Sequence, residues 1–409
     1  MASIFVINVP AHGHINPTLP WVRALVERGH RVTYYATPRH QAKIEQSGAA
    51  FRSYDAALDQ MELPNNLFAL TNLLIQLTEQ LLPMLLDDVQ RDRPDLIVHD
   101  SLATWGRAVA QLAGVPAVNS TSTFALNERV IARSPRFLTQ FGAMVIPGLA
   151  HLARRIRVAR RLRQRYGLRS LGFRDLVSNV GQLNLVYTAR SFQPCGNTFG
   201  QGWQFVGPSL PTFVEVELPL IRNEQPLVYI SLGTIFNNQL AFFQNCLRAF
   251  ADAPVQVLLA VGQQIDLAAL GRVPSNITVQ RFVPQLAVLR QAALFITHGG
   301  VNSVHEGLCA GVPLLVFPQT PEQVLVAEQV AAVGAGRILT PRDTAPARLR
   351  THAQAVMTPA YHTAAQRVGD ELRRAGGYQR AADLIEASLP ARSSGPTSVA
   401  IISTTSATV

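Results

Sequence analysis

Short apolar segments alternate with longer stretches of helical periodicity along most of this chain. The short segments span residues 4–9, 31–36, 96–99, 117–120, 185–188 and 204–206, and then 227–231, 255–261, 277–280, 294–297 and 314–317. They do not alternate strictly with polar residues, which is typical of strands covered on both faces of a parallel sheet. Because helices separate them, right-handed βαβ units should follow. The pattern predicts an α/β protein with two Rossmann-like domains that face each other across a cleft.

A proline-rich stretch without clear periodicity separates the two series of strands. It begins at Gly207 and continues through Pro219 to polar residues near Gln225, and this composition is typical of a linker between domains. A last helical segment and a tail rich in serine and threonine follow the second series, and we expect the tail to be disordered. The predicted boundaries are 1–207 for the first domain, 208–225 for the linker, 226–370 for the second domain, 371–390 for the last helix and 391–409 for the tail.

The bulk composition indicates a folded protein of more than one domain. The chain has 409 residues, of which 48% are apolar and 15% are charged, and this excludes a disordered protein. No uninterrupted apolar stretch of about 18 residues occurs, and the first residues predict a strand and not a signal peptide. Cys195, Cys246 and Cys309 are widely spaced, so we expect no disulfide framework and predict a cytoplasmic location.

The formal net charge of +10 comes largely from one segment, because eight arginines lie between Arg154 and Arg169. Apolar residues recur there at helical spacing, which predicts a basic amphipathic helix over residues 151–169. A solvated arginine face on a surface helix is the interpretation that we favour. The alternative is peripheral contact with an anionic membrane, whereas the absence of a nucleic-acid motif or interleaved aromatic residues argues against nucleic-acid binding.

Two histidines follow the first predicted strand directly. Residues 10–17 read PAHGHINP and lead into a segment of helical spacing that ends at Gly29, so His12 and His14 should lie at the carboxyl end of a strand, where α/β sheets bind ligands. The positive end of the following helix disfavours an imidazolium. A neutral imidazole is suited to general-base catalysis. The alternative is that both histidines only shape the loop.

A carboxylate also follows a predicted strand. Asp100 comes after the apolar residues 96–98 and should therefore lie at the same edge of the sheet. It could hold a basic histidine in one tautomer and stabilise its protonated form, as the aspartate of a catalytic triad does. The alternative is that Asp100 caps the next helix, and separation along the chain does not decide whether it contacts His14.

The second half contains a segment with the chemistry of a nucleotide site. A predicted strand ends in Thr297-His298-Gly299-Gly300, and a helix is expected to begin near Asn302. Two glycines let a ligand approach the backbone, and the free N–H groups of a helix start favour phosphate. Further side chains could contact the remaining parts of a nucleotide: donors on His298, Asn302 and Ser303, an acceptor for ribose hydroxyls on Glu306, and a flat ring for a base on Phe282.

These residues resemble the sugar-nucleotide signature of the UDP-glycosyltransferases, which form glycosyltransferase family 1. The resemblance covers residues 281–290 and 294–323, and the chain to about residue 389 is similar to the bacterial macrolide-glycosyltransferase branch of that family. Residues 10–17, the SLGT of 231–234 and the glycine pair and Ala-Ala-Asp of 376–383 match in the same order. Several spaced motifs in the correct order make a chance match improbable.

The resemblance implies a fold and a set of site residues. It implies the GT-B fold, with the acceptor bound mainly by the first domain, the donor by the second, and the last helix crossing back onto the first domain. His14 would be the general base and Asp100 its partner. The resemblance assigns the donor to Thr234, Phe282, Val283, Gln285, His298, Gly300, Asn302, Ser303, Glu306, Glu322 and Gln323, with Thr121 or Ser120 reaching the sugar from the first domain.

The implied reaction is an inverting transfer of a hexose, with glucose the leading expectation, from a UDP-sugar to a hydroxyl of a small lipophilic acceptor, giving a β-glycoside. No metal site and no cofactor besides the UDP-sugar is expected. Apolar residues are expected to contact the acceptor, namely Ile15, Leu67, Phe68 and Phe124. The alternatives are another GT-B enzyme, either a UDP-sugar 2-epimerase or a lipid-linked sugar transferase, and a non-catalytic protein that binds UDP-sugar or lipid.

Overall fold

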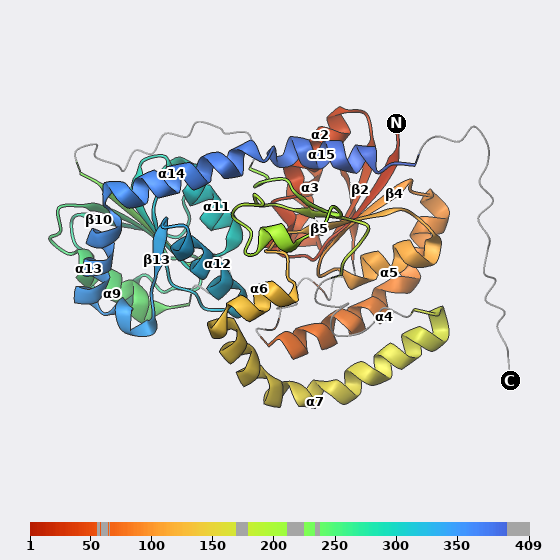
Figure 1. Cartoon of the computed structure of the whole chain (residues 1–409), viewed down its shortest axis with the longest axis horizontal. Coiled ribbons are helices and arrows are strands. Elements are labelled where there is room, and N and C mark those ends of the chain that lie inside the picture. The colour runs from red at the N-terminus through yellow and green to blue at the C-terminus, as the bar shows by residue number, and fades with distance from the viewer. Residues whose placement is uncertain are drawn as a thin grey trace.

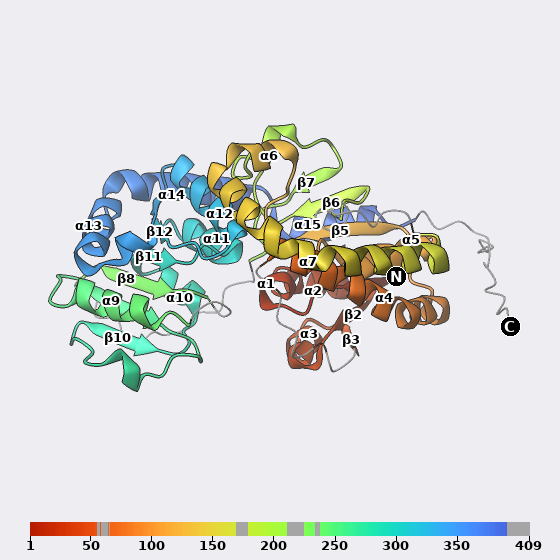
Figure 2. The ribbon, with the colours of Figure 1, turned by 90° about the horizontal axis from the view of Figure 1, so that it is seen from below.

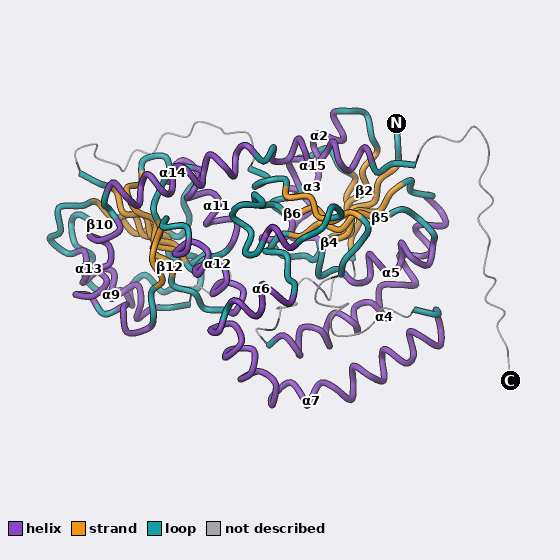
Figure 3. The backbone as a smooth tube through the Cα atoms, in the orientation of Figure 1, coloured by secondary structure: helices purple, strands orange, loops and turns teal. Residues whose placement is uncertain are grey.

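Two parallel sheets, each flanked by helices, lie side by side in the computed structural model of the chain (Figures 1 and 3). The structure describes residues 1–54, 58, 64, 66–168, 179–210, 225–233 and 238–390. The greater part of the predicted linker 208–225 and the whole predicted tail 391–409 lie outside the described residues. The prediction of an α/β protein with the GT-B arrangement of two parallel sheets is confirmed.

The first sheet has seven strands, all paired in parallel. Its spatial order is β3 (Ala50–Ser53), β2 (Arg31–Ala36), β1 (Ser3–Ile7), β4 (Leu96–Asp100), β5 (Ala117–Thr121), β6 (Leu183–Val186) and β7 (Trp203–Phe205). The order reverses beside β1, since β2 lies on one side of it and β4 on the other. Ligands of doubly wound sheets bind at the carboxyl ends of strands beside such a reversal.

The second sheet has six strands, also paired in parallel. Its spatial order is β10 (Ile277–Gln280), β9 (Gln256–Ala260), β8 (Leu227–Ser231), β11 (Ala292–Thr297), β12 (Leu314–Val316) and β13 (Gly336–Ile338). Here the order reverses between β8 and β11. The carboxyl ends of these two strands therefore form the second place where a ligand is expected.

Helices connect most successive strands in both halves, whereas 3₁₀ turns lie between β6 and β7 and between β9 and β10. In the first half they are α1 (His12–Ile15), α2 (Leu19–Glu27), α3 (Gln41–Glu45), α4 (Leu67–Asp92), α5 (Thr104–Ala113), α6 (Glu128–Arg133) and α7 (Pro135–Tyr166). In the second half they are α9 (Leu240–Phe250), α10 (Gln285–Leu289), α11 (Val301–Cys309), α12 (Pro321–Ala332), α13 (Pro346–Val356), α14 (Pro359–Arg374) and α15 (Gly377–Ala387). Short 3₁₀ turns lie at Pro38–His40, Gly196–Thr198, Ala268–Leu270 and Pro341–Thr344.

Alternate residues of the central strands pack into different apolar cores. Ile4 and Val6 of β1 pack with α2 and α15, whereas Phe5 and Ile7 pack with α4 and α5. Successive side chains of a strand point to opposite faces, so both faces of the sheet are covered. This explains why the strands appear in the sequence as apolar runs without polar alternation.

The second sheet is covered in the same way, and one of its cores extends into the first half of the chain. Val228 and Ile230 of β8 pack with α9 and α13, whereas Tyr229 belongs to the core on the side of α11, α12 and α14. Aromatic residues of the first half join that second core, namely Phe124, Phe137, Phe192, Phe199 and Phe205. The two halves therefore share an apolar contact surface.

The end of the described chain runs along both halves (Figure 1). The helix α14 packs on α11, and α15 packs on α2 of the first half. The chain turns between them at Gly376 and Gly377, which have φ angles of 106° and 62°, values that L-residues with a side chain rarely adopt. The backbone N–H of Gly377 donates to the carbonyl of Val206 at 2.5 Å. The predicted boundary at residue 370 falls inside α14, so the crossing begins a few residues later.

The observed strands differ from the predicted ones mainly at the edges of the sheets. The sequence pattern did not indicate β3 or β13, which are short edge strands with exposed or polar residues such as Arg52 and Arg337. The sixth strand begins two residues earlier than predicted, at Leu183. Edge strands have one neighbour and need less apolar sequence, so periodicity identifies them less well.

The helix α4 is long and apolar enough to cross a membrane by length and composition alone, over residues 68–92. In the structure it lies between α5 and α7. Of its most apolar stretch of 18 residues, 50% is buried inside the protein. Packing in the first half of the chain accounts for its composition.

Candidate active site

The loop after β1 is held by a small buried hydrogen-bond network. Asn8 donates through Nδ2 to the carbonyl of His14 at 3.1 Å and to the hydroxyl of Tyr34 at 2.7 Å. Thr18 shares a hydrogen bond with the same hydroxyl at 2.6 Å and donates to the carbonyl of Ile15 at 2.7 Å. Three side chains thus fix the backbone of the one-turn helix α1 on which His14 lies.

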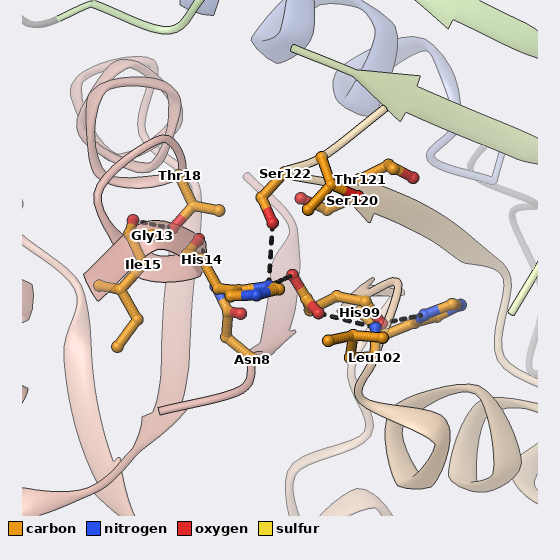
Figure 4. Close-up of polar contacts among 12 residues, drawn as sticks. Asn8, Gly13, His14, Ile15, Thr18, His99, Leu102, Ser120, Thr121 and Ser122 are labelled. Carbon is orange, nitrogen blue, oxygen red and sulfur yellow. Dashed lines mark hydrogen bonds and ion pairs between the residues drawn. The ribbon is translucent and has the colours of Figure 1, made fainter. Parts of the chain in front are cut away.

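The imidazole of His14 lies against a carboxylate and a hydroxyl (Figure 4). Its Nδ1 is 2.8 Å from Oδ2 of Asp100 and 2.9 Å from Oγ of Ser122. The other carboxylate oxygen of Asp100 accepts the backbone N–H of Leu102 at 2.8 Å, which fixes the orientation of the carboxylate. Because Asp100 is an acceptor, the proton of a neutral His14 lies on Nδ1 and its Nε2 is the basic nitrogen.

The electrostatics of His14 differ from the sequence-based expectation. The start of the following helix was expected to lower its basicity. Burial does lower the pKa of His14, but the charge and hydrogen bond of Asp100, with a smaller contribution from Glu322, raise the pKa above its ordinary value of 6.5. Since α1 has only four residues, its helix dipole is small, and the carboxylate has the greater effect.

The other histidine of the loop has a different environment. His12 packs edge-to-face against His40, with 4.8 Å between the ring centroids. Burial, and then the charges of Lys43 and Arg39, lower the pKa of His12. The pKa values of these two histidines, two residues apart, are therefore shifted in opposite directions, and His14 is the one paired with a carboxylate.

The loop after β11 has the features of a phosphate site. Gly299 has a φ of 89°. Gly300 precedes α11, and the first turn of this helix has neither a side-chain cap nor an acidic residue. The first N–H groups of such a helix are free to bind an anion. A Cβ on Gly233 or Gly300 would lie 2.6 Å from the ring of His298, so glycine is required on both sides of this ring. Burial lowers the pKa of His298 to about 4, so it is a neutral hydrogen-bond donor at pH 7.

A second network orients the side chains predicted to bind ribose. Gln285 accepts the hydroxyl of the buried Tyr229 at 3.0 Å. Its amide nitrogen donates to Glu306 at 2.6 Å and to Ser303 at 3.2 Å. Burial raises the pKa of Glu306, whereas the hydrogen bond from Gln285 lowers it, and the net direction is upward. The structure thus brings together Gln285, Ser303 and Glu306, which the sequence placed up to 21 residues apart.

The two loops meet between the halves of the chain. Asn302, in the first turn of α11, donates to the carbonyl of Gly13 beside His14 at 3.0 Å. Glu322 lies in the first turn of α12, and its charge acts on His14. A nearby buried contact joins Thr188 of the first half to His305 of α11 at 3.0 Å. The histidine–aspartate pair and the uncapped helix start therefore face each other.

Other predicted donor residues have varied environments. Phe282 is 57% exposed, so its ring is open to a stacking partner, and Val283 packs at the margin of the shared core. Gln323 is buried and accepts the N–H of Gln319 at 2.8 Å. Thr234 lies outside the described residues.

On the side of the first half, several predicted contacts are buried. The hydroxyl of Ser120 pairs with Tyr187 at 2.7 Å, and Thr121 is buried as well. Figure 4 shows both lying farther from the His14 ring than Ser122. Both are about as buried as Ser122, and their use in donor binding stays a prediction.

The residues predicted to contact an acceptor are mostly enclosed. Ile15 is fully buried in the core of the first sheet and points away from His14 (Figure 4). Phe124 is buried against Phe192, with 5.8 Å between ring centroids. Phe68 is half-buried at the start of α4, and the side chain of Leu67 lies outside the described residues. Ile15 was expected to contact the acceptor, and its complete burial leaves no exposed surface for that contact.

Sequence reasoning missed Ser122, the second partner of His14. It follows β5 directly, just as Asp100 ends β4, and the two strands pair in register with Asp100 opposite Ser120. The signal that located Asp100, a polar residue at the carboxyl end of a strand, was therefore also present at residue 122. Asn8 and Tyr34 were missed because they act on the backbone of the loop.

Among the described residues, no group of three or more histidine, cysteine, aspartate or glutamate side chains is placed to hold a metal ion. The three cysteines are not paired with one another. Independence of metal stays a prediction.

Comparison with known proteins gives consistent results along the chain. Residues 245–379 match the family model described as erythromycin biosynthesis protein CIII-like, C-terminal domain. NDP-glycosyltransferase YjiC of Bacillus licheniformis is 38% identical over 94% of this chain and 97% of its own length. Oleandomycin glycosyltransferase of Streptomyces antibioticus is 32% identical over 96% and 92%. The crystal structure of the glycotransferase of kitacinnamycin superposes with a TM-score of 0.82 at 32% identity, covering 95% of this chain and 99% of that one.

Proposed function

The chain belongs to the macrolide and NDP-glycosyltransferase family of GT-B enzymes, and on this premise we propose that it transfers a hexose from UDP to a hydroxyl of a small lipophilic acceptor with inversion. One observation carries this proposal. The Nδ1 of His14 is bound to Asp100 at 2.8 Å, and the same loop is bound to the first turn of α11. A base and an anion site thus meet in one place.

The proposed chemical step is a single displacement. Nε2 of His14 takes the proton of the acceptor hydroxyl while the acceptor oxygen attacks the anomeric carbon. The bond from that carbon to the phosphate oxygen breaks, and UDP leaves with the electron pair. Asp100 stabilises the imidazolium that forms, because its carboxylate is desolvated and oriented by Leu102.

The second half would stabilise the leaving diphosphate. The N–H groups of the first turn of α11 would donate to the diphosphate. Their partial positive charge would stabilise the leaving phosphate oxygen more strongly as that oxygen gains negative charge. His298 would donate a hydrogen bond as a neutral imidazole, since burial lowers its pKa to about 4. Asn302 would exchange the carbonyl of Gly13 for a phosphate oxygen. Together these donors supply the stabilisation that a metal ion provides in other transferases.

The donor is proposed to be UDP-glucose. The exposed ring of Phe282 offers a stacking face for uracil, and Gln285 with Glu306 forms an acceptor-rich pair for ribose hydroxyls. Glu322 lies near His14, where the sugar of the donor would be. The relatives named NDP-glycosyltransferase and oleandomycin glycosyltransferase support a nucleoside-diphosphate sugar as the donor and a natural product as the acceptor, and a lipophilic alcohol or phenol is proposed here.

A donor-by-acceptor panel tests the proposal. UDP-glucose, UDP-N-acetylglucosamine and dTDP-glucose are combined with macrolide, flavonoid and sterol acceptors, nucleotide release is measured, and the anomeric configuration of the product is read by proton NMR. We expect release of UDP that depends on the acceptor and a β-glycoside from an α-linked donor. Epimerisation of UDP-N-acetylglucosamine without acceptor, or binding without turnover of any pair, would establish one of the alternative functions instead.

Two variants of the same loop locate the base. His14→Ala should reduce kcat by about 10²–10⁴-fold, the usual contribution of a general base. His12→Ala is the matched control, because His12 packs on His40 and has no contact with Asp100 among its described interactions. Parental turnover by His14→Ala, or an equal loss in both variants, would refute the assignment of His14.

A further inference from the structure

The helix α7 carries a concentration of positive charge that the proposed reaction does not use. Its 32 residues contain eight arginines and no aspartate or glutamate. Seven of these arginines lie in its second half, between Arg154 and Arg165. Favourable placement near the negative end of the helix accounts for Arg163 and Arg165, which lie in the last turn, but not for the others.

One face of this half-helix packs into the protein. Val158 and Leu162 are buried in the same apolar cluster as the leucines of α4. Arg161 is held by Glu79 of α4 through two hydrogen bonds of 2.6 and 2.7 Å. The inner face and one flank are therefore occupied by α4, and the charge of Arg161 is neutralised.

The opposite face of this half-helix is exposed. Residues 152, 156, 160 and 163 follow the spacing i, i+4, i+8 and i+11, so they share one stripe of the helix, and residue 157 lies beside it. We call these five residues the α7 outer face: Leu152, Ile156, Arg157, Arg160 and Arg163. All five are exposed, with Ile156 at 56% and Leu152 at 38%. In the view from below, α7 runs in front of the other elements of the first half (Figure 2).

We propose that the α7 outer face docks on the surface of a membrane that contains anionic phospholipids. Three arginines supply attraction to lipid phosphates and carboxylates, since no acidic side chain of α7 opposes them. Leu152 and Ile156 lie among these arginines and can enter the boundary between head groups and acyl chains, as the apolar side of an interfacial helix does. The charge of the surface and its interleaved apolar residues thus fit the same partner.

A nucleic acid fits this face less well. A phosphate backbone would attract the arginines, but Leu152 and Ile156 would gain little from it, and the outer face has no aromatic side chain for stacking on bases. The proposal does not depend on the identity of the sugar or the acceptor. Membrane docking can therefore be refuted while the proposed reaction holds, and the proposed reaction can be refuted while membrane docking holds.

Vesicle flotation with the full-length chain tests the proposal. Vesicles of phosphatidylcholine alone are compared with vesicles that contain phosphatidylserine, at low and at physiological salt. We expect binding only to the anionic vesicles and weakening with salt, because the Debye length shortens to about 8 Å at 0.15 M. Arg157→Gln/Arg160→Gln should lower the partition coefficient about 30-fold, since each arginine near an anionic surface contributes about fivefold.

An apolar variant and matched controls separate docking from general charge. Ile156→Ser should weaken binding about fivefold, because part of an isoleucine side chain would no longer leave water. Exposed residues of the second half serve as controls, with Arg272→Gln/Arg342→Gln for charge and Val273→Ser for apolar area. These controls should bind as the parent does, and equal thermal unfolding midpoints should show that all variants are folded.

Three results would overturn the proposal. The first is no binding to anionic vesicles at low salt. The second is an equal loss of binding in the control variants, which would mean that total charge and not the α7 outer face is recognised. The third is tight binding of a generic RNA that Arg157→Gln/Arg160→Gln abolishes and Ile156→Ser leaves unchanged, which would identify the face as a polyanion site.

Discussion

Replacement of Asp100 by asparagine is expected to inactivate the enzyme more completely than replacement by alanine. The reason lies in the hydrogen bond from the backbone N–H of Leu102 to Oδ1 of Asp100 at 2.8 Å. An asparagine must place its carbonyl oxygen toward this N–H, because its NH₂ group cannot accept a hydrogen bond. The NH₂ group then occupies the position of Oδ2 and donates to Nδ1 of His14.

The consequence is the wrong tautomer of His14. When Nδ1 accepts a hydrogen bond, the proton of the neutral ring lies on Nε2, and the basic nitrogen no longer faces the acceptor hydroxyl. The same change in a serine-protease triad lowers kcat by about 10⁴-fold, and we expect a loss of about 10³–10⁴-fold for Asp100→Asn. Asp100→Ala removes one hydrogen bond to a charged group, about 1.5–3 kcal/mol, which corresponds to roughly 10- to 150-fold.

Ser122 makes the comparison informative. In Asp100→Ala, Nδ1 of His14 can still donate to the hydroxyl of Ser122, which lies 2.9 Å away, so the productive tautomer survives. The assay is UDP release at saturating donor and acceptor, with the thermal unfolding midpoint as the check on folding. Asp100→Asn turning over as fast as Asp100→Ala, or faster, would refute the tautomer argument even if both variants were slow.

Three other outcomes follow from the same geometry. Ser122→Ala should lower kcat about 3- to 10-fold, the effect of one hydrogen bond, with little change in the KM of the acceptor. An unchanged kcat with a raised acceptor KM would contradict the action of Ser122 through His14. Because the pKa of His14 is raised above 6.5 and the neutral ring is the base, kcat/KM should fall as the pH drops through a value above 6.5. An acid limb below 6.5 in the pH profile would be inconsistent with this ionisation. Gly233→Ala should raise the KM of the donor, because its Cβ would meet the His298 ring at 2.6 Å. Gly271→Ala is the control, since Gly271 has the same φ of 78° and no atom within 4 Å of a Cβ, and this variant should only lower the unfolding midpoint. Equal donor KM values in the two variants would rule out the displacement of His298.

Much of the fold could be predicted from hydrophobic periodicity. The central strands were located to within about two residues because burial on both faces leaves no room for polar side chains, as in β1 and β8. The edge strands β3 and β13 were missed, since an edge strand is covered less and tolerates residues such as Arg52 and Arg337. The sequence also located the polar residues at the strand ends, because parallel strands direct their carboxyl ends to one edge.

The tertiary structure alone decided which of these residues act together. The sequence contained His14 and Asp100 but could not show their contact across 86 residues, nor that this carboxylate would raise the basicity of a histidine placed at a helix start. It offered Ser120 and Thr121, whereas in the structure Ser120 pairs with Tyr187 and the hydroxyl that contacts the His14 ring belongs to Ser122. Local sequence determines periodicity, turns and helix starts, which depend on neighbouring residues. Distances between side chains and the pKa values that depend on them are set by which strands and domains lie together, and this is fixed only when the whole chain has packed.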